Sequence, residues 1–373
     1  MAPTNPPGIL VLQQVRALIE QGVVRADPPV AAAQLQPASL DLRLGRRGYR
    51  IRTGFLPETV PVMTRVEELS LYDFDLTGGA VLEKGHCYLI PLLESLALPP
   101  ELTVRSNPKS STGRLDIFTR MLADRCPRFE ATRPGYQGPL FLEVVPRSFS
   151  IRVATGQSLN QIRFFRGDPK LSDADLRELY RATPLLFRAD GSPTPLADVT
   201  FDDGLCMGVA LSRDRDLTGP IGYRARRFAP IVDLGREAAH DPSRFFEAIP
   251  APEGGRLIVE PEEFYLFASK ERVVVPRELA AEMAPYDVGI GEVRTNYAGF
   301  FDNGFGGRHG TRAVLEVRPH DVPFLVEDGQ VFFKLQFFRS TTPPERAYGE
   351  AGLSSHYQGQ GLKLSKHFAA FPS

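Results

Sequence analysis

Residues 81–102 read VLEKGHCYLIPLLESLALPPEL, and residues 258–279 read IVEPEEFYLFASKERVVVPREL. Tyrosine, glutamate and proline recur in both stretches at a constant offset of 177 residues. A second block repeats at an offset of 173, where LEV at 142–144 matches LEV at 315–317 and FF at 164–165 matches FF at 337–338. Two collinear blocks that differ only by a four-residue gap indicate two copies of one domain.

Strand-length apolar runs dominate both copies, and 33 Gly and 33 Pro residues are spread along the chain as turn formers. We therefore predict a mostly β protein with two tandem domains and a few short helices. The predicted segments are a first domain at 1–165, a helical connector at 166–200, a second domain at 201–340 and a tail at 341–373.

Apolar spacing predicts a helix within residues 9–21, and Ser172 with Asp175 three residues later predicts the start of another. A third helix is predicted over residues 242–248. Strands are predicted at Cys87–Leu92, Leu140–Val145, Glu263–Ala268 and Val331–Phe338.

The composition excludes several classes of protein. Lys and Arg total 44 against 45 Asp and Glu, which argues against a nucleic-acid binder. No apolar run reaches the ~18 residues of a membrane span, and no basic segment followed by an apolar run opens the chain, so we expect a cytoplasmic protein. Three separated cysteines (Cys87, Cys126 and Cys206), with no Cys-x-x-Cys or His-Glu-x-x-His pattern, predict neither a disulfide framework nor a zinc site.

The stretch Lys109–Arg114 places two cations and three hydroxyls within six residues. Such a stretch is either a solvated loop or a phosphate-binding segment with charge-assisted donors. The second copy carries Tyr286–Gly291 at the equivalent place and lacks the cluster. The two copies have therefore specialised differently.

Two glutamates, Glu143 and Glu316, occupy the same place in the two copies, each inside an apolar strand. Each is either an outward, solvated side chain or an inward carboxylate whose raised pKa suits proton transfer. Asp302 precedes a glycine-rich turn, whereas the first copy has Arg133 there. Asp41 shows the reverse pattern, with Gly208 aligned in the second copy.

The tail from Tyr348 to Gly361 is rich in Gly and Ser, and it also carries tyrosines and glutamines. It is either an ordinary disordered C-terminus or a lid that orders over a ligand through stacking and hydrogen bonds.

Residues 36–45, 109–114, 134–143 and 348–360 together resemble the dCTP deaminases of the dUTPase superfamily, in a long, duplicated form. This resemblance implies β-barrel or jelly-roll-like domains that assemble as a homo-oligomer with sites between domains. It implies hydrolysis of dCTP to dUTP and ammonia without zinc, with magnesium bound through the triphosphate and dTTP as a possible inhibitor.

Carried over by position, the resemblance makes Ser110 the water-orienting serine and Arg114 the pocket arginine. Glu143 and Glu316 both align with the catalytic glutamate; we favour Glu316 in a composite site between the copies and interpret Glu143 as relict or structural. The substrate-binding residues implied are Lys109 and Ser111 for phosphate, Asp302 and Ala298 near the deoxyribose, and Tyr348, His356, Tyr357, Gln358 and Gln360 in the lid.

Two departures and two alternatives accompany this interpretation. His356 stands where the family usually has lysine, and Arg133 stands where it has an acid. The first alternative is a dUTPase or a bifunctional enzyme, in which Asp302 activates water for attack on the α-phosphate. The second is a regulatory protein that binds nucleotide without turnover.

Overall fold

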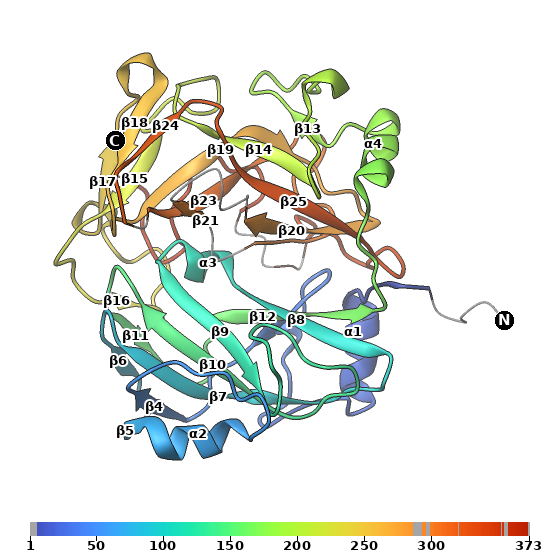
Figure 1. The fold of residues 1–373 in the computed structure, drawn as a ribbon, viewed down its shortest axis with the longest axis vertical. Coiled ribbons are helices and arrows are strands. Elements are labelled where there is room, and N and C mark those ends of the chain that lie inside the picture. The colour runs from blue at the N-terminus through green and yellow to red at the C-terminus, as the bar shows by residue number, and fades with distance from the viewer. Residues whose placement is uncertain are drawn as a thin grey trace.

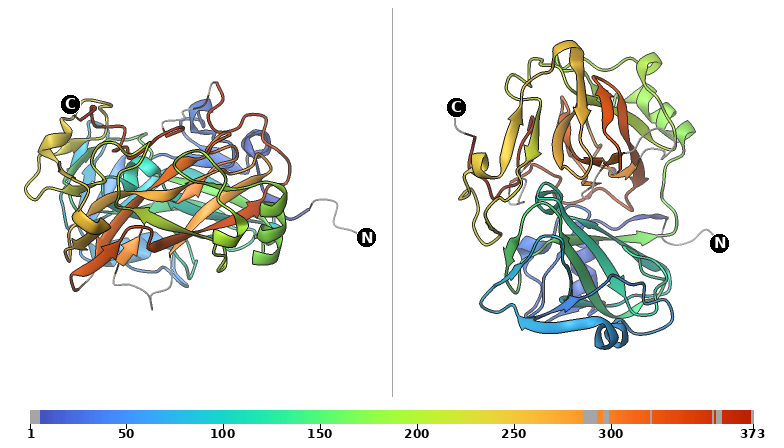
Figure 2. Two further views of the ribbon diagram at one scale, coloured as in Figure 1. Left: turned by 90° about the horizontal axis from the view of Figure 1, so that it is seen from above. Right: turned by 60° about the vertical axis from the view of Figure 1, so that its left-hand side comes forward.

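The computed structural model describes residues 6–285, 293–295, 299–319, 321–351, 353 and 357–371. The N-terminal copy forms the lower half of Figure 1 and the C-terminal copy the upper half. Both halves are built from β-sheets with few helices, which confirms the predicted mostly β fold in two tandem domains. The right-hand view of Figure 2 shows the two halves meeting edge to edge.

The N-terminal copy contains two larger sheets and a small one. One larger sheet runs β1 (Gly8–Ile9), β12 (Asn160–Arg166), β3 (Leu40–Leu42), with β8 (Leu102–Pro108) also on β12. The other runs β5 (Ser70–Asp75), β4 (Arg47–Ile51), β7 (Cys87–Ala97), β10 (Gln137–Pro146), β9 (Ile117–Ala123), with β2 (Val24–Ala26) on β7. The small sheet is completed from the other copy: β16 (Val232–Asp233), β11 (Ile151–Val153), β6 (Ala80–Leu82).

The C-terminal copy is dominated by one sheet of ten strands. Its main path is β17 (Phe246–Ile249), β15 (Gly222–Ala225), β19 (Tyr265–Val273), β14 (Leu205–Ala210), β25 (Val331–Arg339), β20 (Leu279–Pro285), β22 (Phe300–Phe301). Off this path lie β13 (Leu186–Phe187), β21 (Val293–Thr295) and β23 (Thr311–Pro319), and a separate pair joins β18 (Arg256–Val259) to β24 (Phe324–Glu327).

The helices are short: α1 (Leu12–Glu20), α2 (Val62–Leu69), α3 (Ser110–Gly113) and α4 (Asp173–Ala182), with 3-10 turns at Ala32–Gln34, Leu196–Asp198, Pro242–Arg244 and Glu253–Gly255. The first two predicted helices correspond to α1 and α4, and the Ser172 hydroxyl caps α4 by accepting from the Asp175 amide. The described residues contain no helix long and apolar enough to span a membrane.

The helix predicted at 242–248 is wrong. Asp241 and Pro242 start only a single 3-10 turn, and the chain then enters β17, which pairs with β15. Strand pairing and the packing of Phe246 against Phe149, with ring centroids 5.3 Å apart, override the local helical signal. The sequence patterns also missed α2, which packs Val62 and Val66 into a small apolar cluster.

Strand register shows the duplication directly. Glu143 lies opposite Leu89 in one copy, and Glu316 lies opposite Leu266 in the other. The hydroxyl of Tyr88 accepts from the Glu83 amide at 2.9 Å, and its counterpart Tyr265 repeats this bond at the same distance. One pairing of the sequence analysis is corrected: register places Cys206, not Gly208, at the position of Asp41.

Equivalent residues of the two copies meet where the halves touch. Phe165 and Phe338 pack edge to face, with ring centroids 5.8 Å apart, and the Arg105 guanidinium lies over both rings. Two buried ion pairs also cross this boundary, joining Arg163 to Asp302 and Asp116 to Arg318. The copies therefore share an interior in which polar groups are paired across the boundary.

The turn that follows Asp302 depends on glycine. Gly306 has φ +89°, and a Cβ there would lie 2.0 Å from the Val273 carbonyl oxygen. We expect Gly306→Ala to lower the free energy of unfolding by roughly 2 kcal/mol or more, because both the backbone angle and the space oppose a side chain. Urea denaturation measures this, and Gly78→Ala is the control, since no atom lies within 4 Å of its Cβ position. Equal losses in the two variants would contradict the prediction.

Candidate active site

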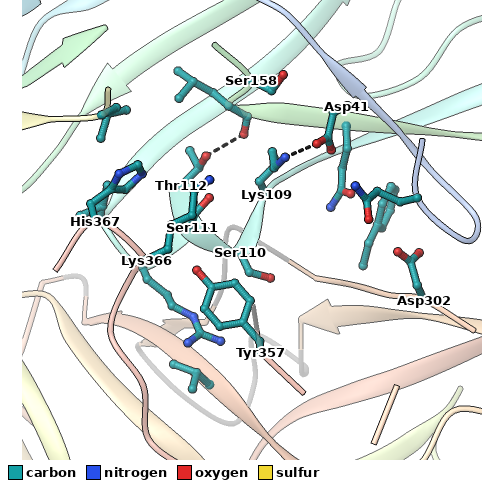
Figure 3. Close-up of a pocket in the computed structure, with 18 of the residues that line it drawn as sticks. Asp41, Lys109, Ser110, Ser111, Thr112, Ser158, Asp302, Tyr357, Lys366 and His367 are labelled. Atoms are coloured by element: carbon teal, nitrogen blue, oxygen red, sulfur yellow. Dashed lines mark hydrogen bonds and ion pairs between the residues drawn. The ribbon is translucent and has the colours of Figure 1, made fainter. Parts of the chain in front are cut away.

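A cavity of about 600 Å³ opens between the two copies and is lined by residues of both. The N-terminal copy contributes α3 and its flanking residues, and the C-terminal copy contributes β23 and the turn that carries Asp302. Tail residues form a further wall (Figure 3). Among the sequence-predicted site residues, the lining includes Lys109, Ser110, Ser111, Arg114, Asp302, Glu316, Tyr348, Tyr357 and Gln360.

The Lys109–Arg114 segment is one helical turn rather than an open loop. The Thr112 hydroxyl donates to the Leu159 carbonyl at 2.8 Å, which holds the turn against β12. The Lys109 ammonium pairs with Asp41. The pKa of Asp41 is raised overall, because burial outweighs the opposing effect of this lysine. Asp41 Oδ1 is buried without a hydrogen-bond partner in the described part of the chain, so this oxygen offers an acceptor beside Lys109 (Figure 3).

Arg114 links the N-terminal copy to the tail. Its Nη1 donates to Gln360 Oε1 at 3.0 Å and to the Lys363 carbonyl at 2.6 Å, and its guanidinium lies 3.9 Å from the Tyr357 ring centroid. Burial lowers the pKa of Arg114, and the nearby charges of Tyr357 and Glu316 oppose this effect. Arg114 and Glu316 line the same cavity, although they belong to different copies.

The two equivalent glutamates have different surroundings. Glu316 is 2% exposed and lines the same cavity as the Lys109–Arg114 turn. Glu143 lines another cavity, where Arg120 donates to its Oε1 from Nε at 2.9 Å and from Nη2 at 2.5 Å. The pKa of Glu143 is raised overall, because burial outweighs the opposing effect of Arg120. Only Glu316 is thus brought together with the candidate phosphate segment.

Asp302 is fixed by an arginine from the other copy. The Arg163 side chain has 0% exposure, and its Nη2 donates to Asp302 Oδ1 at 2.8 Å and to the Phe301 carbonyl at 2.9 Å. Its Nη1 donates to the Ala281 carbonyl at 2.8 Å, and its guanidinium lies 4.1 Å from the Phe300 ring centroid. Arg163 was not among the sequence-predicted site residues, although a single cation inside the apolar run at 162–165 could have indicated a buried ion pair.

The tail is fixed on both sides of the cavity. The Tyr348 amide donates to the Asn303 carbonyl at 2.8 Å, and its hydroxyl accepts from the Tyr357 amide at 3.3 Å. Beyond the cavity, the Ser365 hydroxyl donates to the Ser111 carbonyl at 2.8 Å, and Phe368 packs among the aromatic rings of Phe245 and Phe246. The tail therefore crosses the cavity as a strap.

One described lid residue named from the sequence, Gln358, does not line the cavity. Gln358 accepts the Gly306 amide at Oε1, 3.1 Å away, and so supports the turn that carries Asp302. Ala298 and His356 lie outside the described residues. Lys366 and His367, which the sequence analysis did not name, line the cavity close to Ser111.

Within the described residues, no group of three or more His, Cys, Asp or Glu side chains is arranged to hold a metal ion.

Comparison with known proteins agrees with this architecture. A family model described as the 2'-deoxycytidine 5'-triphosphate deaminase N-terminal domain matches residues 6–168, and the corresponding C-terminal domain model matches residues 172–368. The crystal structure of 2'-deoxycytidine 5'-triphosphate deaminase from Agrobacterium tumefaciens superposes with a TM-score of 0.83 at 41% identity, covering 91% of this chain and 99% of that one.

Shorter relatives match less than half of the chain. The dUMP-forming dCTP deaminase of Streptomyces coelicolor is 29% identical over 155 residues, which is 41% of this chain and 78% of the relative. That of Corynebacterium efficiens is 32% identical over 160 residues, again 41% of this chain and 81% of the relative.

The fold and cavity define a class: enzymes made of two tandem β-domains with a site shared between them. The two family models together extend over residues 6–168 and 172–368. The chain belongs to the dCTP deaminase family.

The first prediction from this geometry concerns Arg163. We expect Arg163→Met to lower the free energy of unfolding by roughly 3 kcal/mol or more, because it leaves buried Asp302 without its cation. Arg105→Met is the control, since Arg105 also lies over aromatic rings at the boundary between the copies but is half exposed, and we expect it to cost about 1 kcal/mol or less. Urea denaturation of both variants, and of the double variant Arg163→Met with Asp302→Asn, measures this. If the double variant loses as much free energy of unfolding as Arg163→Met and Asp302→Asn lose separately in sum, the two residues are not coupled and the prediction is contradicted.

A second prediction concerns His367. Burial lowers the pKa of His367 to about 4, with Lys366 and His240 acting in the same direction and Glu237 opposing. An unfolded histidine has a pKa of about 6.5, so protons favour the unfolded chain below that pH and stability falls as pH drops from about 6.5 toward 4.

We expect His367→Gln to remove roughly 2 kcal/mol of the stability difference between pH 8 and pH 5. Urea denaturation at both pH values measures this, with His86→Gln as the control for a half-exposed histidine. An unchanged pH dependence in His367→Gln would refute the assignment.

Proposed function

We propose that this protein hydrolyses dCTP to dUTP and ammonia in the cavity between its two copies. The observation that carries the proposal is that one cavity holds the Lys109–Arg114 turn of one copy together with Glu316 of the other. Separate halves of a phosphate-binding and proton-transferring site thus come together within a single chain.

The chemistry needs a base, a held water and a proton donor. We assign the base to Glu316, which takes a proton from water as the water oxygen attacks C4 of the cytosine. The same carboxyl group returns that proton to ring N3, and a further transfer through it releases the 4-amino group as ammonia while a carbonyl forms at C4. Ser110 would orient the water, and the tail strap would exclude bulk solvent.

Arg114 is assigned a supporting role. Its guanidinium lies over the Tyr357 ring and lines the same cavity as Glu316, and attraction to a cation favours the carboxylate form that a base requires. Asp302, held by Arg163, would accept a hydrogen bond from the 3'-hydroxyl of the deoxyribose.

The triphosphate would lie against Lys109 and Ser111. Magnesium would enter on the triphosphate, where it neutralises part of the phosphate charge. The partnerless Oδ1 of Asp41, beside Lys109, is the described carboxylate oxygen that best fits a position close to that ion. Lys109 would remain the direct cationic donor to phosphate.

A second candidate function is deamination followed by cleavage to dUMP. The dUMP-forming names of the Streptomyces and Corynebacterium relatives favour it, although these relatives match only 41% of this chain. In this alternative, Asp302 would activate water for attack on the α-phosphate. Homo-oligomerisation, inhibition by dTTP and a cytoplasmic location stay predictions.

The test is incubation of the purified protein with dCTP and magnesium, followed by ion-exchange separation of nucleotides and assay of ammonia. We expect dUTP and ammonia in equal amounts. We expect Glu316→Gln to lower kcat on the order of 10³-fold, because the amide cannot accept the water proton. Glu143→Gln is the matched control at the same strand position and should keep kcat within about threefold.

Each other outcome has a definite meaning. Formation of dUMP and pyrophosphate would establish the second candidate function. Equal losses in Glu316→Gln and Glu143→Gln, or full activity in Glu316→Gln, would reject the composite site. Unchanged dCTP, with nucleotide bound, would show a regulatory protein that binds without turnover.

A further inference from the structure

A second cavity, of about 920 Å³, also lies between the two copies and has no part in the proposed reaction. Its N-terminal wall is formed by β7, β9 and β10, and its C-terminal wall by residues 225–229 and 262–264. This cavity is larger than the one of about 600 Å³ assigned to a deoxynucleoside triphosphate. Space for a ligand of that size is therefore available.

The lining of this second cavity is strongly cationic. Six basic side chains face three carboxylates, which gives a net charge of +3, whereas the candidate active site has four carboxylates against three cations. The whole chain carries a net charge of −1, so this concentration of positive charge is local. The basic residues are Lys84, Arg120, Arg147, Arg226, Arg227 and Arg318.

Several of these cations remain available to a ligand. Arg147 reaches Glu262 only at 3.4 Å, and Arg227, although it pairs with Glu263, is 72% exposed. Lys84 forms no ion pair with any residue that the structure describes. Clustered arginines with exposed donors are suited to the non-bridging oxygens of a polyphosphate.

Glu143 lies in the floor of the cavity and is nearly fully buried. Arg120 donates to its Oε1, its Oε2 is buried, and the Cys87 thiol also hydrogen-bonds to the carboxylate. Glu143 is therefore held by groups of its own copy, and the binding of a ligand falls to the cations and the aromatic ring at the rim of the cavity.

Phe228 supplies an aromatic surface at the same cavity. Its side chain is fully exposed and its backbone is in the left-handed region at φ +57°. A phenylalanine in that conformation, presented to solvent between Arg227 and Ala229, costs free energy that the fold itself does not recover. An exposed ring beside clustered arginines is the combination that stacks a base and binds its phosphates.

We propose that this cavity is a second, non-catalytic binding site for a nucleoside triphosphate. The base stacks on Phe228, and the phosphates lie against Lys84, Arg147 and Arg227. The site lacks turnover because Arg120 holds Glu143 as an ion pair and because, among the described residues, the lining contains no serine-rich turn like Lys109–Arg114.

The test is isothermal titration of the full-length, unaltered protein with the α,β-imido analogue of dUTP, which can be neither deaminated nor cleaved at that bond. We expect two molecules bound per chain. In the double variant Arg227→Glu with Phe228→Ala, we expect one molecule per chain, with affinity at the second site at least tenfold weaker. Deamination by this variant at low dCTP should stay within about twofold, because both residues lie outside the active site.

Arg181→Glu is the matched control, since Arg181 is also an exposed, ion-paired arginine but lies on α4, away from the cavity. It should keep two molecules per chain. Binding of one molecule per chain by the unaltered protein would overturn the proposal. Light scattering that shows a smaller assembly for the double variant would also overturn it, because the cationic surface would then be a contact between chains.

Discussion

The structure depends on the ion pair between Arg163 and Asp302, which joins the two copies inside their shared interior. A guanidinium without exposure must have its charge and its donors satisfied, because an unpaired buried charge costs several kcal/mol. Asp302 pairs with its charge, the Phe301 and Ala281 carbonyls accept from its Nη donors, and all three belong to the C-terminal copy. The position of the Asp302 turn relative to β12 is thereby set, and with it one wall of the cavity.

Duplication makes this arrangement possible within one chain. One copy keeps the Lys109–Arg114 turn, while the other keeps Glu316, Asp302 and the strap that crosses between them. Two halves on one polypeptide meet without the translational entropy cost of association. Each copy is then free to lose what the other supplies, which accounts for Tyr286–Gly291 standing where the first copy has its phosphate segment.

Much of the fold could be predicted from sequence because it rests on local and repeated patterns. The offsets of 177 and 173 anticipated the shared register of Glu143 and Glu316, and Ser172 anticipated the start of α4. The helix predicted at 242–248 does not form, because pairing with β15 and packing on Phe149 decide the conformation of this segment. Both partners are remote in sequence. Arg163 was missed for the same reason, since its partner lies 139 residues away.

The two glutamates show why a motif alone does not define a site. Their sequence neighbours and strand registers match, yet Glu143 is paired with Arg120 whereas Glu316 lines the candidate active site. Thr119 and Thr295 hold equivalent places, but the residue that follows is Arg120 in one copy and Asn296 in the other. One arginine fixes Glu143 as an ion-paired carboxylate. Glu316 instead lines the cavity that Arg114 of the opposite copy also lines, and the proton-transferring role is therefore proposed for Glu316.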